Sequence, residues 1–179
     1  MLAGAQTPVL AVVGWSGSGK TTVIERLIPA LAKIGIPRVA VIKHSHHRLT
    51  DTPGKDTDRL QRAGATVVGL VGEDGYLLRC QYALPREGLE GLMTLLPTLG
   101  PFDLVLLEGF KRRPGPKIEV VRRGVSVELI SSPEELLAVI GDVPPPAGIP
   151  WVRFGEEERL AVIVKKWLNR PEGGGQART

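Results

Sequence analysis

The segment from Gly14 to Thr22, with the sequence GWSGSGKTT, has the residue types and the spacing of a phosphate-binding loop. It matches the pattern G-x-x-x-x-G-K-[ST] at every fixed position. The glycines allow backbone angles that aim successive amide groups at one anion, and the helix expected after them adds its positive amino end. In such loops the lysine bridges the β- and γ-phosphates, and the hydroxyl that follows it ligates Mg²⁺. We expect the following residues to contact the phosphates, with Thr21 also on the metal: Gly14, Ser16, Gly17, Ser18, Gly19, Lys20, Thr21 and Thr22.

The surroundings of this loop favour a functional loop over a glycine-rich turn that matches by chance. Val9–Val13 is a short apolar run and predicts a buried parallel strand. Thr21–Lys33 has apolar residues at helical spacing. A strand before the glycines and a helix after them are the context that the pattern requires. Trp15, inside the loop, either packs beside it or contacts the ligand.

A second apolar run offers a carboxylate on the expected metal side. Leu104–Leu107 predicts a buried strand, and Glu108 and Gly109 follow it. In phosphate-loop proteins a carboxylate at the end of such a strand holds Mg²⁺ or its water shell, and Gly109 leaves room for a γ-phosphate. Asp103 lies at the opposite end of the strand and is a poor metal candidate. The alternative is that Glu108 is a surface carboxylate after a core strand.

Asp56 and Asp58 are further carboxylates, in a segment that could face the nucleotide. One of them could act as a general base, orient a water molecule or help to hold Mg²⁺. Either could instead be a helix cap or a solvated charge in a first helical turn. The candidate catalytic residues are therefore Lys20, Asp56 and Glu108.

The histidine-rich segment Lys43–His47 follows a predicted strand, Val39–Ile42, at its carboxyl end. Three histidines within four residues are compatible with a metal, but no cysteine is near to complete a structural zinc site. With Lys43 and Arg48 they could instead donate hydrogen bonds to an anion, which we favour over a transition metal. A surface loop with incidental histidines is the third alternative. The residues that we expect to line this anion region are Lys43, His44, His46 and His47.

The elements that must position these residues alternate between strands and helices. This alternation predicts an α/β fold, the three-layer sandwich of P-loop NTPases, with a mostly parallel sheet, helices on both faces and ligands at the carboxyl ends of the strands. We expect one nucleotide-binding domain over residues 1–170 and a disordered tail over residues 171–179. The expected strands are Val9–Val13, Val39–Ile42, Thr66–Val71, Tyr76–Gln81, Leu104–Leu107, Lys117–Val121, Leu137–Ile140 and Trp151–Phe154. The expected helices are Thr21–Lys33, Asp56–Ala63, Pro85–Leu96 and Glu156–Asn169.

Composition narrows the classes of function. The net charge of +4 mildly favours anionic partners, and the basic runs Lys111–Arg113 and Arg122–Arg123 are equally compatible with solvated surface and with a phosphate-facing patch. Aromatic residues make up only 4%, so we expect no nucleic-acid partner that stacks bases. No apolar run is long enough for a membrane span, and Cys80 is the only cysteine. We therefore expect a cytoplasmic protein without membrane contact.

Four segments together resemble the molybdopterin-guanine dinucleotide biosynthesis protein B (MobB) family. Their order and spacing match over about residues 8–165. The phosphate loop is shared by many families, whereas K-H-[ST]-H-H and E-G-F-K are much more distinctive. The four segments are Val12–Thr22, Val41–His47, Asp56–Asp58 and Leu107–Lys111.

The resemblance implies a homodimeric GTP-binding protein of the P-loop GTPase class, related to nickel-insertion and signal-recognition GTPases, with weak Mg²⁺-dependent hydrolysis. It implies assistance to a partner guanylyltransferase that attaches GMP to molybdopterin. By that similarity Gly17 to Thr22 hold phosphates and Glu108 lies on the Mg²⁺ side. Lys43–His47 would line the region where cofactor or substrate anions approach.

The chain departs from the usual pattern of GTP-binding proteins in one respect. It has no N-K-x-D motif, which would recognise the guanine base. Asp142 is the carboxylate best placed to accept from the guanine N1 and N2 groups, although Gly141-Asp142 before prolines is also an ordinary turn. An ATP-dependent small-molecule kinase is the alternative function, with Arg112 and Arg113 on a mobile lid. A third alternative is an adaptor without enzymatic activity, in which the nucleotide switches a dimer interface.

The predicted strands Thr66–Val71 and Tyr76–Gln81 form a hairpin insertion around Glu73-Asp74-Gly75. An isolated two-stranded hairpin is only marginally stable in water, so it must pack on its own domain or extend a neighbouring chain's sheet. The family resemblance favours the second arrangement. We therefore expect a two-fold symmetric homodimer that uses this hairpin.

Overall fold

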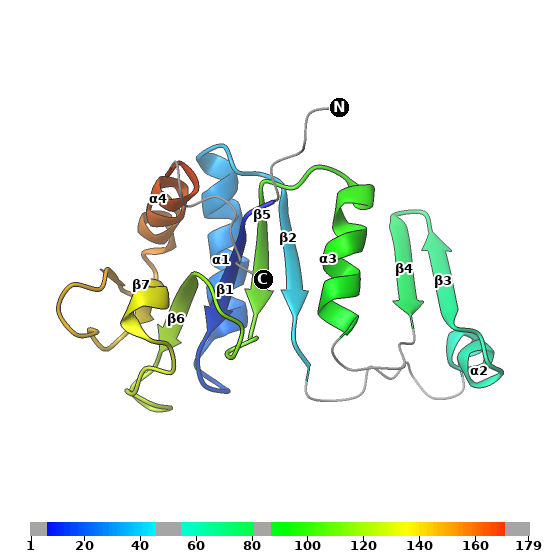
Figure 1. The fold of residues 1–179 in the computed structure, drawn as a ribbon, viewed down its shortest axis with the longest axis horizontal. Coiled ribbons are helices and arrows are strands. Elements are labelled where there is room, and N and C mark those ends of the chain that lie inside the picture. Colours follow the sequence, from blue (N-terminus) through cyan, green and yellow to red (C-terminus); the bar gives the residue numbers. More distant parts are fainter. Residues whose placement is uncertain (1–6, 46–54, 81–86, 171–179) are drawn as a thin grey trace. The chain divides into compact units, whose positions relative to one another are not determined.

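The computed structural model describes residues 7–45, 55–80 and 87–170 (Figure 1). The chain forms two compact units. The sheet unit comprises Met1–His44 and Pro101–Thr179, and the hairpin unit comprises Ser45–Gly100. The single domain expected over residues 1–170 stays a prediction, and the tail of residues 171–179 lies outside the described residues.

The sheet unit contains six strands in the order β2-β5-β1-β6-β7-β8, and every neighbouring pair is parallel. The carboxyl ends of all six strands therefore lie at one edge of the sheet. The segments after β1 and β5 are neighbours there, as predicted. The strands are β1 (Val9–Val13), β2 (Val39–Lys43), β5 (Leu104–Glu108), β6 (Lys117–Val121), β7 (Leu136–Gly141) and β8 (Trp151–Val152).

Two helices, α1 (Lys20–Lys33) and α4 (Glu157–Leu168), pack on one face of this sheet (Figure 1). Side chains alternate along a strand, so Leu10 and Val12 of β1 point to the helices while their neighbours point to the other face. Leu27 of α1 and Leu160 of α4 are fully buried against them. Each such leucine contributes about 1.5–3 kcal/mol of transfer free energy. The α/β class with a mostly parallel sheet is confirmed.

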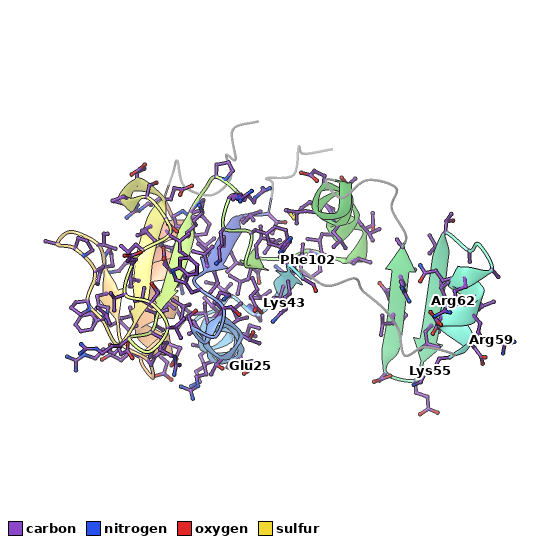
Figure 2. The ribbon with its side chains drawn as sticks, turned by 90° about the horizontal axis from the view of Figure 1, so that it is seen from below. Glu25, Lys43, Lys55, Arg59, Arg62 and Phe102 are labelled. Carbon is purple, nitrogen blue, oxygen red and sulfur yellow. The ribbon has the colours of Figure 1, made fainter. Side chains whose placement is uncertain are left out.

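The hairpin unit contains helix α2 (Asp56–Arg62), strands β3 (Val67–Gly72) and β4 (Gly75–Cys80), and helix α3 (Glu87–Leu99). The two strands pair antiparallel and close at Gly72 and Gly75, so the predicted hairpin turn is confirmed. Helix α2 packs on β3, and Lys55, Arg59 and Arg62 are displayed along it in Figure 2.

Most predicted boundaries agree with the structure within one residue, and the predicted ends at Gln81 and Pro85 lie outside the described residues. Two ends differ by more, and one element was not predicted. Helix α3 continues through Pro97 to Leu99, beyond the expected end at Leu96. Strand β8 ends at Val152 and not at Phe154, because Gly155, with a φ of 91°, turns the chain into α4. A short 3₁₀ helix, Pro133–Glu135, was not predicted. In the described ranges, no helix is both long enough and apolar enough to cross a membrane.

Candidate nucleotide site

The glycine loop joins β1 to α1, and its backbone depends on glycine. Gly14 has a φ of 143°, and a Cβ there would lie 2.5 Å from the carbonyl oxygen of Val120. Gly19 has a φ of 99°, a conformation that residues with side chains rarely adopt, and it precedes the first turn of α1. The glycines therefore fix the loop against β6 and begin the helix.

The loop fits an anion with several oxygen atoms. No side chain caps the amino end of α1, so its first amide groups are open to a ligand. The hydroxyl of Ser18 is buried and has no hydrogen-bond partner. A buried unpaired hydroxyl is costly, and a phosphate oxygen would accept its hydrogen bond. Both features suit the phosphates predicted from the sequence.

Lys20 is held by the loop itself. Its Nζ donates to the carbonyl oxygens of Gly14, at 3.1 Å, and of Trp15, at 2.8 Å. Burial lowers the pKa of Lys20 most; Lys111 and Lys43 lower it further, while Glu108 raises it. These three charges therefore lie close enough to act on Lys20.

The expected metal ligands also meet. The Thr21 hydroxyl donates to Oε1 of Glu108 at 2.8 Å, across the sheet edge between α1 and β5. The Nζ of Lys43 donates to the same Oε1 at 2.8 Å and to the Thr21 Oγ1 at 3.1 Å. A hydroxyl and a carboxylate are hard oxygen ligands of the kind that Mg²⁺ takes beside phosphate oxygens and water. The pair fits the predicted metal, which Thr21 and Glu108 would hold.

The histidine segment is described only in part. The His44 amide donates to the carbonyl oxygen of Glu108 at 2.9 Å, and its ring meets that of Phe110 edge to face, with 5.1 Å between centroids. His46 and His47 lie outside the described residues. Across the part of the chain that the structure covers, no group of three His, Cys, Asp or Glu residues could hold a metal. The anion region expected here stays a prediction.

Two further carboxylates predicted for the site, Asp56 and Asp142, have other partners in the structure. Asp56 is on α2 of the hairpin unit, where its side chain is 92% exposed and pairs with Arg59 at 3.4 Å. Asp142 follows β7, and its Oδ1 accepts a hydrogen bond from the Arg123 amide at 2.8 Å. It lies at the same edge of the sheet as the glycine loop. The roles of both residues stay predictions.

One residue from each of the two basic runs noted in the sequence contacts the glycine loop. The Nε of Arg122 donates to the Ser18 carbonyl oxygen at 3.2 Å, and its guanidinium lies 4.7 Å from the centroid of the Phe154 ring. The Nζ of Lys111 lies 4.6 Å from the centroid of the Trp15 ring. The sequence left open whether these runs are solvated surface, and the position of Arg122 directly after β6 is what brings it to the loop.

The sheet is parallel, and a glycine loop follows one of its central strands. A lysine, a hydroxyl and a carboxylate gather at that loop. These features define a P-loop NTPase-like α/β protein. Residues 9–142 match the family described as MobB, molybdopterin guanine dinucleotide synthesis protein B. The chain belongs to this family.

Relatives over the whole length agree with that assignment. The molybdopterin-guanine dinucleotide biosynthesis adapter protein of Escherichia coli (strain K12) is 36% identical over 174 residues, which cover 93% of this chain and 96% of the relative. The protein of the same name from Haemophilus influenzae is 37% identical over 170 residues, covering 94% and 93%. The crystal structure of Bacillus subtilis MobB aligns with a TM-score of 0.67 at 27% identity, covering 89% of this chain and 97% of that one.

Proposed function

We propose that this protein is a GTP-binding adapter in molybdopterin guanine dinucleotide biosynthesis, with weak Mg²⁺-dependent GTP hydrolysis. The role in this pathway follows from the family and from the adapter proteins that the chain resembles. The observation that supports nucleotide binding is the arrangement of Lys20, Thr21 and Glu108 at the open end of α1.

Each of these side chains has a task at a triphosphate. Lys20 exchanges the carbonyl oxygens of Gly14 and Trp15 for β- and γ-phosphate oxygens, which are stronger acceptors. Thr21 and Glu108 would hold Mg²⁺, which when bound neutralises charge on the phosphates. Ser18 gains an acceptor for its buried hydroxyl.

The weak hydrolysis that we propose comes from the family resemblance. Fast P-loop GTPases orient the attacking water with a glutamine. The glycine loop itself, Gly14–Thr22, contains no glutamine. A nucleotide that is hydrolysed slowly suits an adapter, whose bound state must outlast its encounter with a partner enzyme. We propose that this partner is the guanylyltransferase that attaches GMP to molybdopterin.

Guanine preference rests on the family and on Asp142. Its carboxylate lies at the end of β7, held by the Arg123 amide, at the sheet edge where the loop binds phosphates. A carboxylate can accept from both N1 and N2 of guanine but meets no such donor pair on adenine.

Calorimetric titration of GTP and of ATP, each with Mg²⁺, tests the proposal. We expect GTP to bind more tightly, and Lys20→Ala to abolish binding at a cost of about 2–4 kcal/mol while the protein stays folded. Lys33→Ala is the matched control, because Lys33 pairs with Glu158 at the other end of α1. Unchanged GTP affinity in Lys20→Ala would refute the phosphate-loop assignment, and a preference for ATP would favour a small-molecule kinase.

A further inference from the structure

Lys43 contacts both of the side chains that are expected to hold the metal ion. It is the last residue of β2 and is in register with Glu108, the last residue of β5, so both side chains leave the same face of the sheet (Figure 2 labels Lys43). Its ammonium group contacts both oxygens of the expected metal pair, Thr21 Oγ1 at 3.1 Å and Glu108 Oε1 at 2.8 Å. The Glu108 side chain is 9% exposed, whereas that of Lys43 is 58% exposed. The carboxylate is thus fixed inside the site, and the lysine reaches it from solvent.

The charges around this pair are unbalanced. Lys43, Lys111 and the single carboxylate of Glu108 all act electrostatically on Lys20. Three ammonium groups and one carboxylate sum to two positive charges. A triphosphate is attracted to such a site, whereas a free divalent cation is repelled by it.

We propose that Lys43 is a tethered cation that occupies the metal position of the nucleotide-free protein and excludes a free divalent cation until a triphosphate binds. This inference rests on the proposed nucleotide function. When the triphosphate arrives, its oxygens offer the Lys43 ammonium a stronger acceptor than a carboxylate shared with a hydroxyl. The long side chain then releases Thr21 and Glu108 to the metal that accompanies the nucleotide. Lys43 is a positioning residue, and it makes metal binding conditional on the nucleotide.

Electron paramagnetic resonance of Mn²⁺, used in place of Mg²⁺, measures directly whether metal binding depends on the nucleotide. The parent protein, stripped of nucleotide, should bind Mn²⁺ weakly and should bind it more tightly with a non-hydrolysable GTP analogue. Lys43→Met removes the charge and keeps the length of the side chain. We expect it to raise the Mn²⁺ affinity of the nucleotide-free protein about tenfold or more.

Two variants serve as controls. Lys43→Arg keeps the positive charge and should exclude Mn²⁺ as the parent does. Lys33→Met removes the same charge from an exposed ion pair with Glu158, at the far end of a 14-residue helix about 20 Å long, and should leave Mn²⁺ affinity unchanged. If Lys43→Met does not fold, Lys43→Gln replaces it, because its amide keeps a hydrogen bond to Glu108.

The results separate this inference from the function on which it rests. Equal Mn²⁺ affinities of the nucleotide-free parent and Lys43→Met would overturn the inference even if GTP binds. Tight Mn²⁺ binding by the nucleotide-free parent would overturn it without any variant. A gain of Mn²⁺ affinity in Lys43→Met, with no nucleotide bound by the parent, would support the exclusion of cations by Lys43 and refute the proposed function.

Discussion

Gly109 and Phe110 turn the chain directly after Glu108. Their φ angles are 91° and 51°, and among the described residues Phe110 is the only one other than glycine with a positive φ. This conformation costs an L-residue about 1–2 kcal/mol, so its contacts must hold it. The ring of His44 packs edge to face on Phe110, and a Cβ on Gly109 would lie 3.2 Å from the Cβ of His44. The ends of β2 and β5 are thus tied together beside the carboxylate.

Glu108→Gln should weaken the dependence of nucleotide binding on Mg²⁺ more than it weakens the binding of GDP. The amide keeps the size of the side chain and can still accept from Thr21, but it loses the negative charge that a divalent cation requires. Calorimetric titrations of GTP with and without Mg²⁺, and of GDP, measure the two effects separately.

Glu158→Gln is the matched control for this prediction. It removes the same charge from a carboxylate that pairs with Lys33 at 2.9 Å on the exposed side of α4 and α1. The control should show the Mg²⁺ dependence of the parent. If Glu108→Gln also shows the Mg²⁺ dependence of the parent, Glu108 is not part of a metal site.

At the scale of elements, the sequence predicts what depends on local pattern. The alternation of apolar strands and amphipathic helices was sufficient to predict β1, α1 and the hairpin, and the spacing of the glycine loop placed Lys20 and Thr21. The apolar run before Glu108 placed this carboxylate at the correct end of a strand. Each of these features is encoded within one short, continuous stretch of the chain.

Features that depend on the order of strands could not be predicted in this way. Lys43 meets Glu108 because β2 lies beside β5 in register, and these residues are 65 positions apart. Arg122 reaches Ser18 because β6 lies beside β1. Sequence spacing indicates that such residues follow strands, but it does not indicate which strands are neighbours.

Arg38 and Asp103 join the starts of β2 and β5 at the edge opposite the site. The backbone amide of Arg38 donates to Oδ2 of Asp103 at 3.0 Å. The Arg38 side chain donates to the same carboxylate, with its Nη2 at 2.6 Å from Oδ1. These hydrogen bonds from Arg38 hold the pKa of Asp103 below its ordinary value. The prediction that Asp103 is a poor metal candidate agrees with this structural role.

Asp103→Asn should therefore lower the free energy of unfolding at neutral pH, by only about 0.5–1 kcal/mol because solvent reaches the pair. A carboxyl group whose pKa is depressed on folding stabilises the protein above its unfolded pKa of about 3.9, and this contribution is lost as the pH falls through the folded pKa. The difference between parent and variant should thus shrink below about pH 4.

Urea unfolding at several pH values, followed by tryptophan fluorescence, to which the buried Trp167 contributes, measures this difference. Glu158→Gln breaks a single exposed contact and should have a smaller effect at pH 7, because Asp103 also accepts from a backbone amide. If the difference in the free energy of unfolding between the parent and Asp103→Asn stays constant down to pH 2.5, the pKa of Asp103 is not depressed by folding.

At the scale of the whole molecule, the hairpin unit presents an apolar surface. Residues that are paired across β3 and β4 share a face, so Val67, Val71, Tyr76 and Leu78 lie on one side of the hairpin. All four are exposed, Val71 to 83%. The opposite face includes the buried Val68, and also the exposed Leu70 and Leu77. Exposed apolar faces of this kind are typical of contacts between chains.

We propose that this face forms the interface of a two-fold symmetric homodimer. A two-stranded sheet is marginally stable alone, and a second copy would bury its apolar side chains. Leu78, which is 46% exposed, packs over Gly69 of the partner strand, with 3.9 Å between its Cδ1 and a Cβ built there. Leu78→Glu would place a charge at the centre of the interface while leaving the strand pairing intact.

Sedimentation velocity at micromolar concentration should show a dimer for the parent protein and monomers for Leu78→Glu, because an unpaired buried carboxylate is costly at an interface. Leu77→Glu is the matched control, since it adds the same charge one residue away on the opposite face and should remain dimeric. A parent protein that sediments as a monomer would defeat the proposal. If Leu78→Glu stays dimeric, the chain still associates but through another surface, and the exposed face of the hairpin is left for a different partner.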